Sequence, residues 1–152
     1  MRYLFDTNIY FQILHDPAYF ARHRATLQQL APQVFLSSVV RLELVQGARG
    51  DVARARIAKA VAPLERVGRV IAPTHADWTQ AGIVQGRIWE DHPSLRSKSL
   101  QNDLLIACSA RRIGAIVITE NKADFDIIRS FVPHRALPMR GLARQFDPSD
   151  PL

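Results

Sequence analysis

Residues 3–10 of the chain read YLFDTNIY, an apolar run that stops at an acid. Tyr3, Leu4 and Phe5 have the composition of a short buried strand, and the polar residues after them are typical of a helix start. Asp6 can therefore be an ordinary helix cap. It also stands at the carboxyl end of the first predicted strand, and the rest of the sequence decides which of these two roles matters.

Short apolar runs of this kind alternate with longer segments of helical periodicity. Strands are predicted near residues 2–5, 34–37, 69–72, 115–118 and 134–137. Helices are predicted near residues 7–14, 18–30, 39–49, 51–66, 75–91, 100–113 and 121–131. Because parallel strands need helical crossovers, the alternation predicts an α/β fold: an α/β/α sandwich with a central parallel sheet of about five strands.

The length and composition favour one domain in a reducing compartment. We expect a single domain over residues 1–142 and a loosely held tail over residues 143–152. Cys108 is the only cysteine, which excludes a disulfide framework and CxxC metal sites. No apolar segment approaches the roughly 20 residues of a membrane span, so we expect a cytoplasmic protein with no membrane partner.

The formal net charge of +6 favours a polyanionic partner such as nucleic acid. The arginines are spread along the chain rather than concentrated in one segment. On composition alone, a solvated arginine-rich surface explains the charge about as well as a nucleic-acid path does.

Acidic residues recur where the predicted sheet would place a site. In open α/β folds every helix begins at the carboxyl edge of the sheet, and ligands bind there. Asp6 ends the first strand. Ser38 is a candidate N-cap, and Glu43 lies about five residues later, on the helical face that also carries Val39 and Val40. A carboxylate on an apolar face indicates that Glu43 points inward.

Two more acids occupy corresponding positions in later helices. Asp103 belongs to the opening turns of its helix and shares a face with Ile106. Asp124 falls in the first turn of a helix that Asn121 can cap. Asp126 competes with Asp124 for this role, but it lies two positions further round the helix and faces elsewhere.

Each acid taken singly has an ordinary explanation, because the helix dipole favours first-turn acids by about 0.3 to 1 kcal/mol. Four carboxylates at one place repel each other by about 4 kcal/mol per pair at 4 Å and an effective dielectric of 20. Either raised pKa values or a divalent cation must offset that repulsion. We favour the cation, and oxygen ligands without His or Cys select Mg²⁺ or Mn²⁺.

Four segments in order carry a resemblance to a known family: Asp6-Thr7-Asn8, Glu43 within ELVQG, Asp103 within NDLLIA, and Thr119-x-Asn121-x-x-Asp124-Phe125. Together they resemble the PIN domain, and the chain is most similar to the VapC-type toxins of bacterial toxin-antitoxin pairs, over roughly residues 1–142. The resemblance implies a PIN-like (Rossmann-like) α/β/α sandwich and a Mg²⁺- or Mn²⁺-dependent endoribonuclease. It also implies a homodimer and a cognate antitoxin that blocks the activity.

Matched by position, the resemblance implies a catalytic and metal-binding quartet of Asp6, Glu43, Asp103 and Asp124. The supporting residues would be Thr7, Asn8, Thr119 and Asn121. The leading hypothesis is hydrolysis of RNA phosphodiester bonds by metal-activated water. The alternative is a degenerate PIN-like module that binds nucleic acid or a protein partner without hydrolysis, and the four intact acids count against it.

Overall fold

The protein folds around a five-stranded parallel sheet, as the alternating pattern predicts. A computed structural model describes residues 1–146 of the chain. The strand order is β3-β2-β1-β4-β5, and each neighbouring pair is parallel. The strands are β1 (Arg2–Phe5), β2 (Val34–Ser37), β3 (Val70–Ile71), β4 (Ala115–Ile118) and β5 (Arg135–Leu137). The first strand is therefore the central one.

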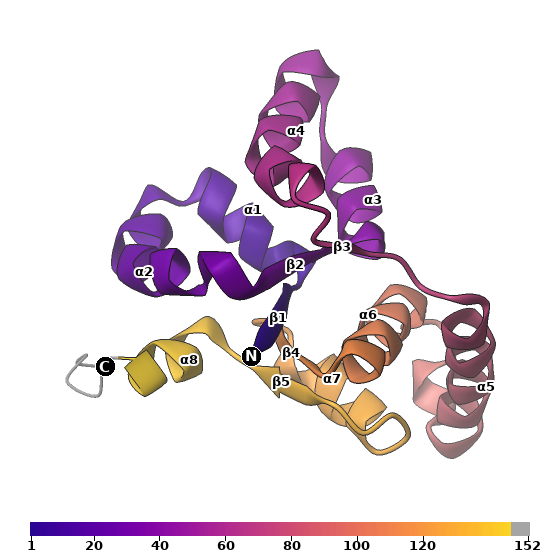
Figure 1. The fold of residues 1–152 in the computed structure, drawn as a ribbon. Coiled ribbons are helices and arrows are strands. Elements are labelled where there is room, and N and C mark those ends of the chain that lie inside the picture. The colour runs from indigo at the N-terminus through magenta and orange to yellow at the C-terminus, as the bar shows by residue number, and fades with distance from the viewer. Residues whose placement is uncertain (147–152) are drawn as a thin grey trace.

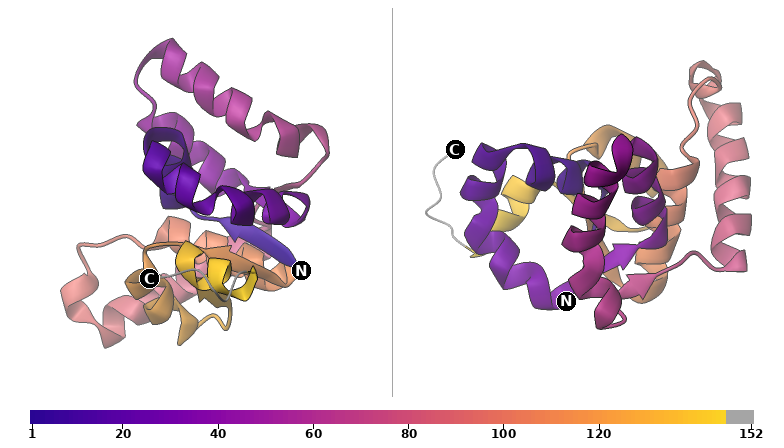
Figure 2. Two further views of the ribbon diagram at one scale, coloured as in Figure 1. Left: turned by 90° about the vertical axis from the view of Figure 1, so that its left-hand side faces the viewer. Right: turned by 90° about the horizontal axis from the view of Figure 1, so that it is seen from above.

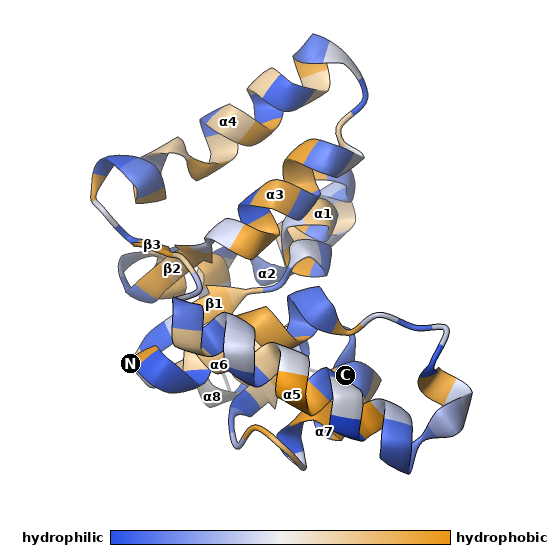
Figure 3. Ribbon diagram, turned by 90° about the vertical axis from the view of Figure 1, so that its right-hand side faces the viewer, coloured by the Kyte–Doolittle hydropathy of each residue, from blue (hydrophilic) through white to orange (hydrophobic). Residues whose placement is uncertain are grey.

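Helices cover both faces of this sheet. They are α1 (Thr7–His15), α2 (Pro17–Leu30), α3 (Ser38–Gly47), α4 (Gly50–Arg66), α5 (His75–Asp91), α6 (Gln101–Ile113), α7 (Lys122–Arg129) and α8 (Met139–Phe146). Short 3₁₀ turns occupy Ala31–Gln33 and Pro93–Leu95. Helices α1 to α4 lie on one side of the sheet and α5 to α7 on the other (Figures 1 and 3). The predicted α/β/α class is confirmed.

The core lies between the sheet and these two helical layers. Leu4 of β1, Val117 of β4 and Ile106 of α6 are fully buried, as strands covered on both faces require. Registers pair Phe5 with Ile118 and Tyr3 with Val34. The carboxyl ends of the three central strands consequently lie at one edge of the sheet, and α1, α3 and the segment after β4 begin there.

Helix α8 was not predicted. It follows Pro138, packs against α2 and buries Met139, Leu142 and Ala143 (Figure 2). The boundary expected at residue 142 therefore falls inside α8. The remainder of the expected tail, residues 147–152, lies outside the described residues, so the division into a domain and a tail stays a prediction.

No helix within residues 1–146 combines the length and the apolar character that crossing a bilayer requires.

Candidate active site

Asp6 stands at the carboxyl end of β1 and is 4% exposed. It caps α1, because its Oδ1 accepts from the backbone N–H of Thr7 at 2.7 Å. Its Oδ2 accepts from the hydroxyl of Thr119 at 2.6 Å and from the amide of Asn8 at 2.7 Å. Burial raises the pKa of this carboxyl, and the neighbouring Glu43 raises it further, while these hydrogen bonds lower it. Asp6 is therefore both a helix cap and a member of a polar cluster.

Glu43 reaches the same cluster from α3. Ser37 rather than Ser38 caps this helix, because its hydroxyl accepts from the backbone N–H of Val39 at 3.2 Å. The glutamate stays on the inner face of α3 and is half-buried. Its two oxygens accept from the hydroxyl of Thr7 and, at 2.8 Å, from the amide of Asn102. Asn102 was not singled out in the sequence, although it directly precedes Asp103.

Asp124 lies in the first turn of α7 and is buried. Asn121 occupies the N-cap position but makes no side-chain cap; its amide donates instead to Asp124 Oδ2 at 2.7 Å. Lys98 Nζ lies 2.6 Å from each carboxylate oxygen of Asp124. Sequence reasoning missed Lys98, which lies in the connection between α5 and α6, where no periodicity marks which way a side chain points.

The pKa of Asp103 reflects the nearness of the other three acids. Burial, followed by the charges of Asp6, Asp124 and Glu43, raises the pKa of its carboxyl to about 7, and Lys98 opposes this shift. Because the charges of all three acids contribute to this shift, Asp103 lies close to each of them. Asp103 also lines a polar hollow of about 350 Å³, together with Glu43, Ser99, Gln101 and Asn102.

The competing acid, Asp126, points away from the cluster. It pairs with Lys122 and, at 3.2 Å, with Arg129 along the surface of α7. Its pKa is lowered, chiefly by the hydrogen bond from Lys122. The structure therefore brings Asp6, Glu43, Asp103 and Asp124 together and leaves Asp126 outside.

The cluster fits a hard divalent cation in donor type and charge. All four acids offer oxygen, and after burial the charges of Asp6, Asp124 and Glu43 contribute to the raised pKa of Asp103, so a cation close to this carboxyl would be stabilised. Yet no three Asp, Glu, His or Cys side chains within residues 1–146 are grouped so as to hold one ion. The hydrogen bonds offer a reason: donors of the protein itself take up the oxygens of Asp6, Glu43 and Asp124. Metal binding therefore requires these side chains to rearrange.

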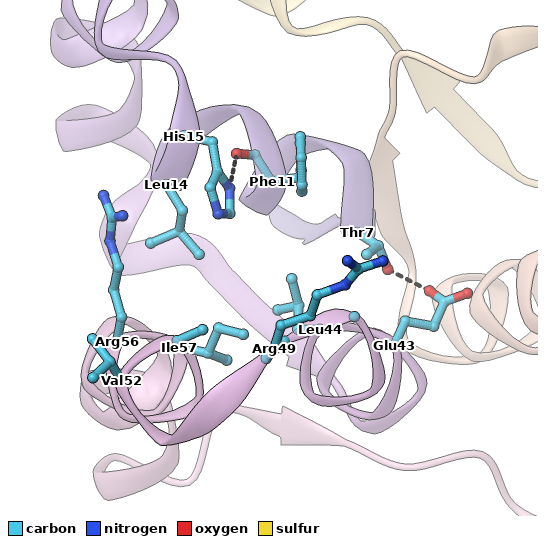
Figure 4. A pocket seen from close by; sticks show the side chains of 13 residues that line it. Thr7, Phe11, Leu14, His15, Glu43, Leu44, Arg49, Val52, Arg56 and Ile57 are labelled. Atoms are coloured by element: carbon cyan, nitrogen blue, oxygen red, sulfur yellow. Dashed lines mark hydrogen bonds between the residues drawn. The ribbon is translucent and has the colours of Figure 1, made fainter.

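A second hollow adjoins the cluster. It has a volume of about 540 Å³, lies between α1, α3 and α4, and is lined mainly by apolar groups such as Phe11, Leu44 and Ile57. Figure 4 shows Thr7 and Glu43 at one end of this groove and Arg56 at the other. The groove thus runs from the acids along the inner side of α4.

Comparison with known proteins adds to this geometry. The family model described as PIN domain matches residues 3–129. Among solved structures, VapBC-1 from nontypeable Haemophilus influenzae is 22% identical with a TM-score of 0.69, over 92% of this chain and 99% of that one. DNA-bound VapBC from Salmonella typhimurium is 23% identical with a TM-score of 0.61, over 91% and 98%. FitAcB from Neisseria gonorrhoeae is 20% identical with a TM-score of 0.62, over 91% and 98%. No curated protein matches the chain in sequence.

Proposed function

The chain belongs to the PIN-domain family, and from this membership we propose that it is a metal-dependent endoribonuclease of the VapC toxin type. The observation that carries the proposal is the gathering of four carboxylates, from the starts of α1, α6 and α7 and from α3, at the carboxyl edge of a parallel sheet. Structures of similar fold that are named as VapBC support the toxin type.

In this proposal Asp6, Glu43, Asp103 and Asp124 hold Mg²⁺ or Mn²⁺. Such an ion, when bound, polarises a phosphoryl oxygen of the substrate and lowers the pKa of a water molecule. The residues around the acids position them. Thr119 and Asn8 fix the carboxylate of Asp6, and Asn121 fixes that of Asp124. In the metal-free protein the pKa of Asp103 is raised to about 7, chiefly by burial, so a cation that binds this carboxyl at neutral pH would displace a proton from it.

Cleavage of a labelled RNA tests the proposal. We expect products with Mn²⁺ or Mg²⁺ and none with EDTA. Asp6→Asn and Asp103→Asn should each lower the rate by more than about 100-fold, the upper end of what losing a supporting residue costs. Asp126→Asn is the matched control, because that acid lies on the outer face of α7, and it should keep the wild-type rate. Cleavage in EDTA, or full activity of either site variant, would contradict the proposal.

A DNA of the same sequence belongs in the same assay, because attack of water on phosphorus needs no 2′-hydroxyl. Cleavage of the RNA alone supports a ribonuclease, whereas equal cleavage of both makes the enzyme a general nuclease.

One observation favours the second candidate function, a PIN-like module that binds without hydrolysis. The oxygens of Asp124 are already satisfied by Lys98 and Asn121, so the acids are not arranged as a ready metal site. This candidate predicts RNA binding that EDTA does not change, with no cleavage products. We rank it second because the charges of Asp6, Asp124 and Glu43 all act on Asp103, and such mutual repulsion favours a bound cation.

We propose an antitoxin as the protein partner. The groove between α1, α3 and α4 is mainly apolar, carries Arg49 and Arg56, and ends at Glu43. A peptide with apolar and acidic side chains would suit this lining, and one that lies in the groove would reach the acid cluster. A homodimer acting in the cytoplasm is also part of this proposal, and light scattering during size-exclusion chromatography measures the oligomeric state.

The groove can be tested on α4 itself. Val52 lines the groove and is 86% exposed, whereas Val67, beyond the other end of α4, is 62% exposed and does not line it. The antitoxin that binds the wild-type chain should no longer co-purify with Val52→Asp and should still co-purify with Val67→Asp. RNA cleavage by the isolated enzyme should be unchanged in both. Equal loss of the partner in both variants would contradict this placement.

A further inference from the structure

Lys98 is a cationic side chain of the protein itself that forms a salt bridge with Asp124, one acid of the cluster. Its ammonium lies 2.6 Å from both oxygens of Asp124, a close charge-assisted contact. It also opposes the rise in the pKa of Asp103. Within residues 1–146, Lys98 is the only basic side chain that forms a salt bridge with any of the four acids.

The backbone at Lys98 is tied to the end of α5. Its carbonyl accepts from the indole N–H of Trp89 at 3.3 Å, and its N–H donates to the carbonyl of Leu95 at 2.9 Å. The backbone therefore stays in place while the four-carbon side chain can turn away.

The two partners of this salt bridge differ in their access to water. The side chain of Lys98 is 49% exposed, whereas that of Asp124 is 8% exposed. The ammonium can therefore leave the carboxylate and be hydrated at little cost. Asp124 cannot follow it, because the amide of Asn121 holds Oδ2 at 2.7 Å. When Lys98 leaves, a nearly buried carboxylate remains without its cation.

We propose that Lys98 occupies the cation position at Asp124 and must be displaced before a divalent metal can bind there, so that it weakens the affinity of the cluster for the metal. This inference rests on the proposed function only in that the acids bind a metal. It concerns the binding equilibrium and not the chemical step. In the free protein Asp124 is thereby paired with a side chain of the chain itself, and a higher concentration of the ion is needed to reach half-saturation.

A role of Lys98 in preparing Asp124 for the metal would predict the opposite change in metal affinity. If Lys98 served to hold Asp124 ready for a metal, its removal would loosen the carboxylate and weaken metal binding. If instead it competes, its removal frees Asp124 and also makes the cluster more negative. A salt bridge of this partly exposed kind leaves roughly two fifths to one sixth of the protein competent to bind the metal, so neutralising Lys98 should tighten binding about two- to sixfold.

Binding of Mn²⁺ to the full chain tests the inference without RNA. Free Mn²⁺ is measured by electron paramagnetic resonance at pH 8 and low salt, for the wild type, Lys98→Met, Lys98→Gln and Lys98→Arg. The matched control is Lys122→Met, which removes the same charge from a salt bridge with Asp126 on the outer face of α7. Circular dichroism checks that each variant is folded. Two neutral variants are included so that the test remains possible if one of them does not fold.

We expect both neutral variants of Lys98 to bind Mn²⁺ about two- to sixfold more tightly than the wild type. Lys98→Arg should stay near the wild-type affinity, because it keeps the charge, and Lys122→Met should not change it. If the wild type binds Mn²⁺ and the neutral variants bind it equally or more weakly, the proposed role of Lys98 is overturned, while the proposed function is not. If neither the wild type nor the variants bind Mn²⁺, the proposed function fails together with it.

Discussion

Replacing Asp103 by asparagine should stabilise the metal-free protein, and the size of the gain should depend on pH. The pKa of this carboxyl is about 7 in the folded protein, against an ordinary value of 3.8, chiefly because it is buried among other acids. Above pH 7 the folded protein must carry a charge that the unfolded chain carries more easily. The cost disappears when the ionisable group is removed, so Asp103→Asn would gain stability at the expense of the proposed function.

The magnitude follows from the two pKa values. Each unit of difference corresponds to about 1.4 kcal/mol, so the shift from 3.8 to about 7 corresponds to roughly 4 kcal/mol at full weight. Asp103 is partly exposed, and solvent screening lowers this figure, so we expect a gain of roughly 2 to 4 kcal/mol at pH 8. The unfolded chain releases the proton near pH 3.8 and the folded chain near pH 7. The wild type therefore loses stability across this window, and the gain shrinks to well under 1 kcal/mol near pH 4.

Urea unfolding in EDTA at several values between pH 4 and pH 8 measures this gain. Asp126→Asn is the control, because the pKa of that exposed acid is lowered by Lys122, so its loss should slightly destabilise the protein at pH 8. Saturating Mn²⁺ should stabilise the wild type more than Asp103→Asn, because a ligand that binds only the folded state raises the free energy of unfolding. A gain that is equal at pH 4 and pH 8, or a loss of stability at pH 8, would refute the reasoning.

Three further outcomes can be checked. Thr119→Val removes the hydroxyl that donates to Asp6 at 2.6 Å and accepts from the backbone N–H of Asn121 at 2.9 Å. The substitution should lower the free energy of unfolding by about 1 to 3 kcal/mol, measured in urea titrations, and it should reduce RNA cleavage. Gly114→Ala should lower the free energy of unfolding by about 1 to 2 kcal/mol, because φ is +65° at the end of α6 while nothing lies within 4 Å of the added Cβ; an unchanged melting temperature would contradict this. Cys108 is buried and burial raises the pKa of its thiol to about 11, so a thiol reagent at pH 8 should modify it only in urea, which mass spectrometry detects.

The sheet could be predicted because its signals are local. Short apolar runs between amphipathic segments predicted each strand to within a few residues, and the parallel arrangement followed from the helical crossovers. The sequence also contains a pattern that would have predicted helix α8. Met139, Leu142 and Ala143 are buried at the spacing of one helical face. Pro138 and Gly141 obscured it, because these residues are also typical of an irregular tail.

The acids could be predicted as a group, whereas their partners could not. Parallel strands bring helix starts to one edge, so Asp6 and Asp124 were expected to converge from topology alone. Lys98 reaches Asp124 from 26 positions away through a flexible side chain, and no pattern in a loop encodes that direction. Asn102 stands beside Asp103 but reaches Glu43 on another helix, which only the packing of α6 against α3 determines.

The central place of β1 constrains when activity can appear during synthesis. This strand is made first, yet one of its two neighbours, β4, begins at residue 115, and Asp124 comes later still. A nascent chain that ends before residue 115 can therefore pair β1 only with β2, and it lacks both Thr119 beside Asp6 and the last acid. An enzyme that cuts RNA would thus remain harmless to the messenger and ribosome that produce it until most of its own sequence has been translated.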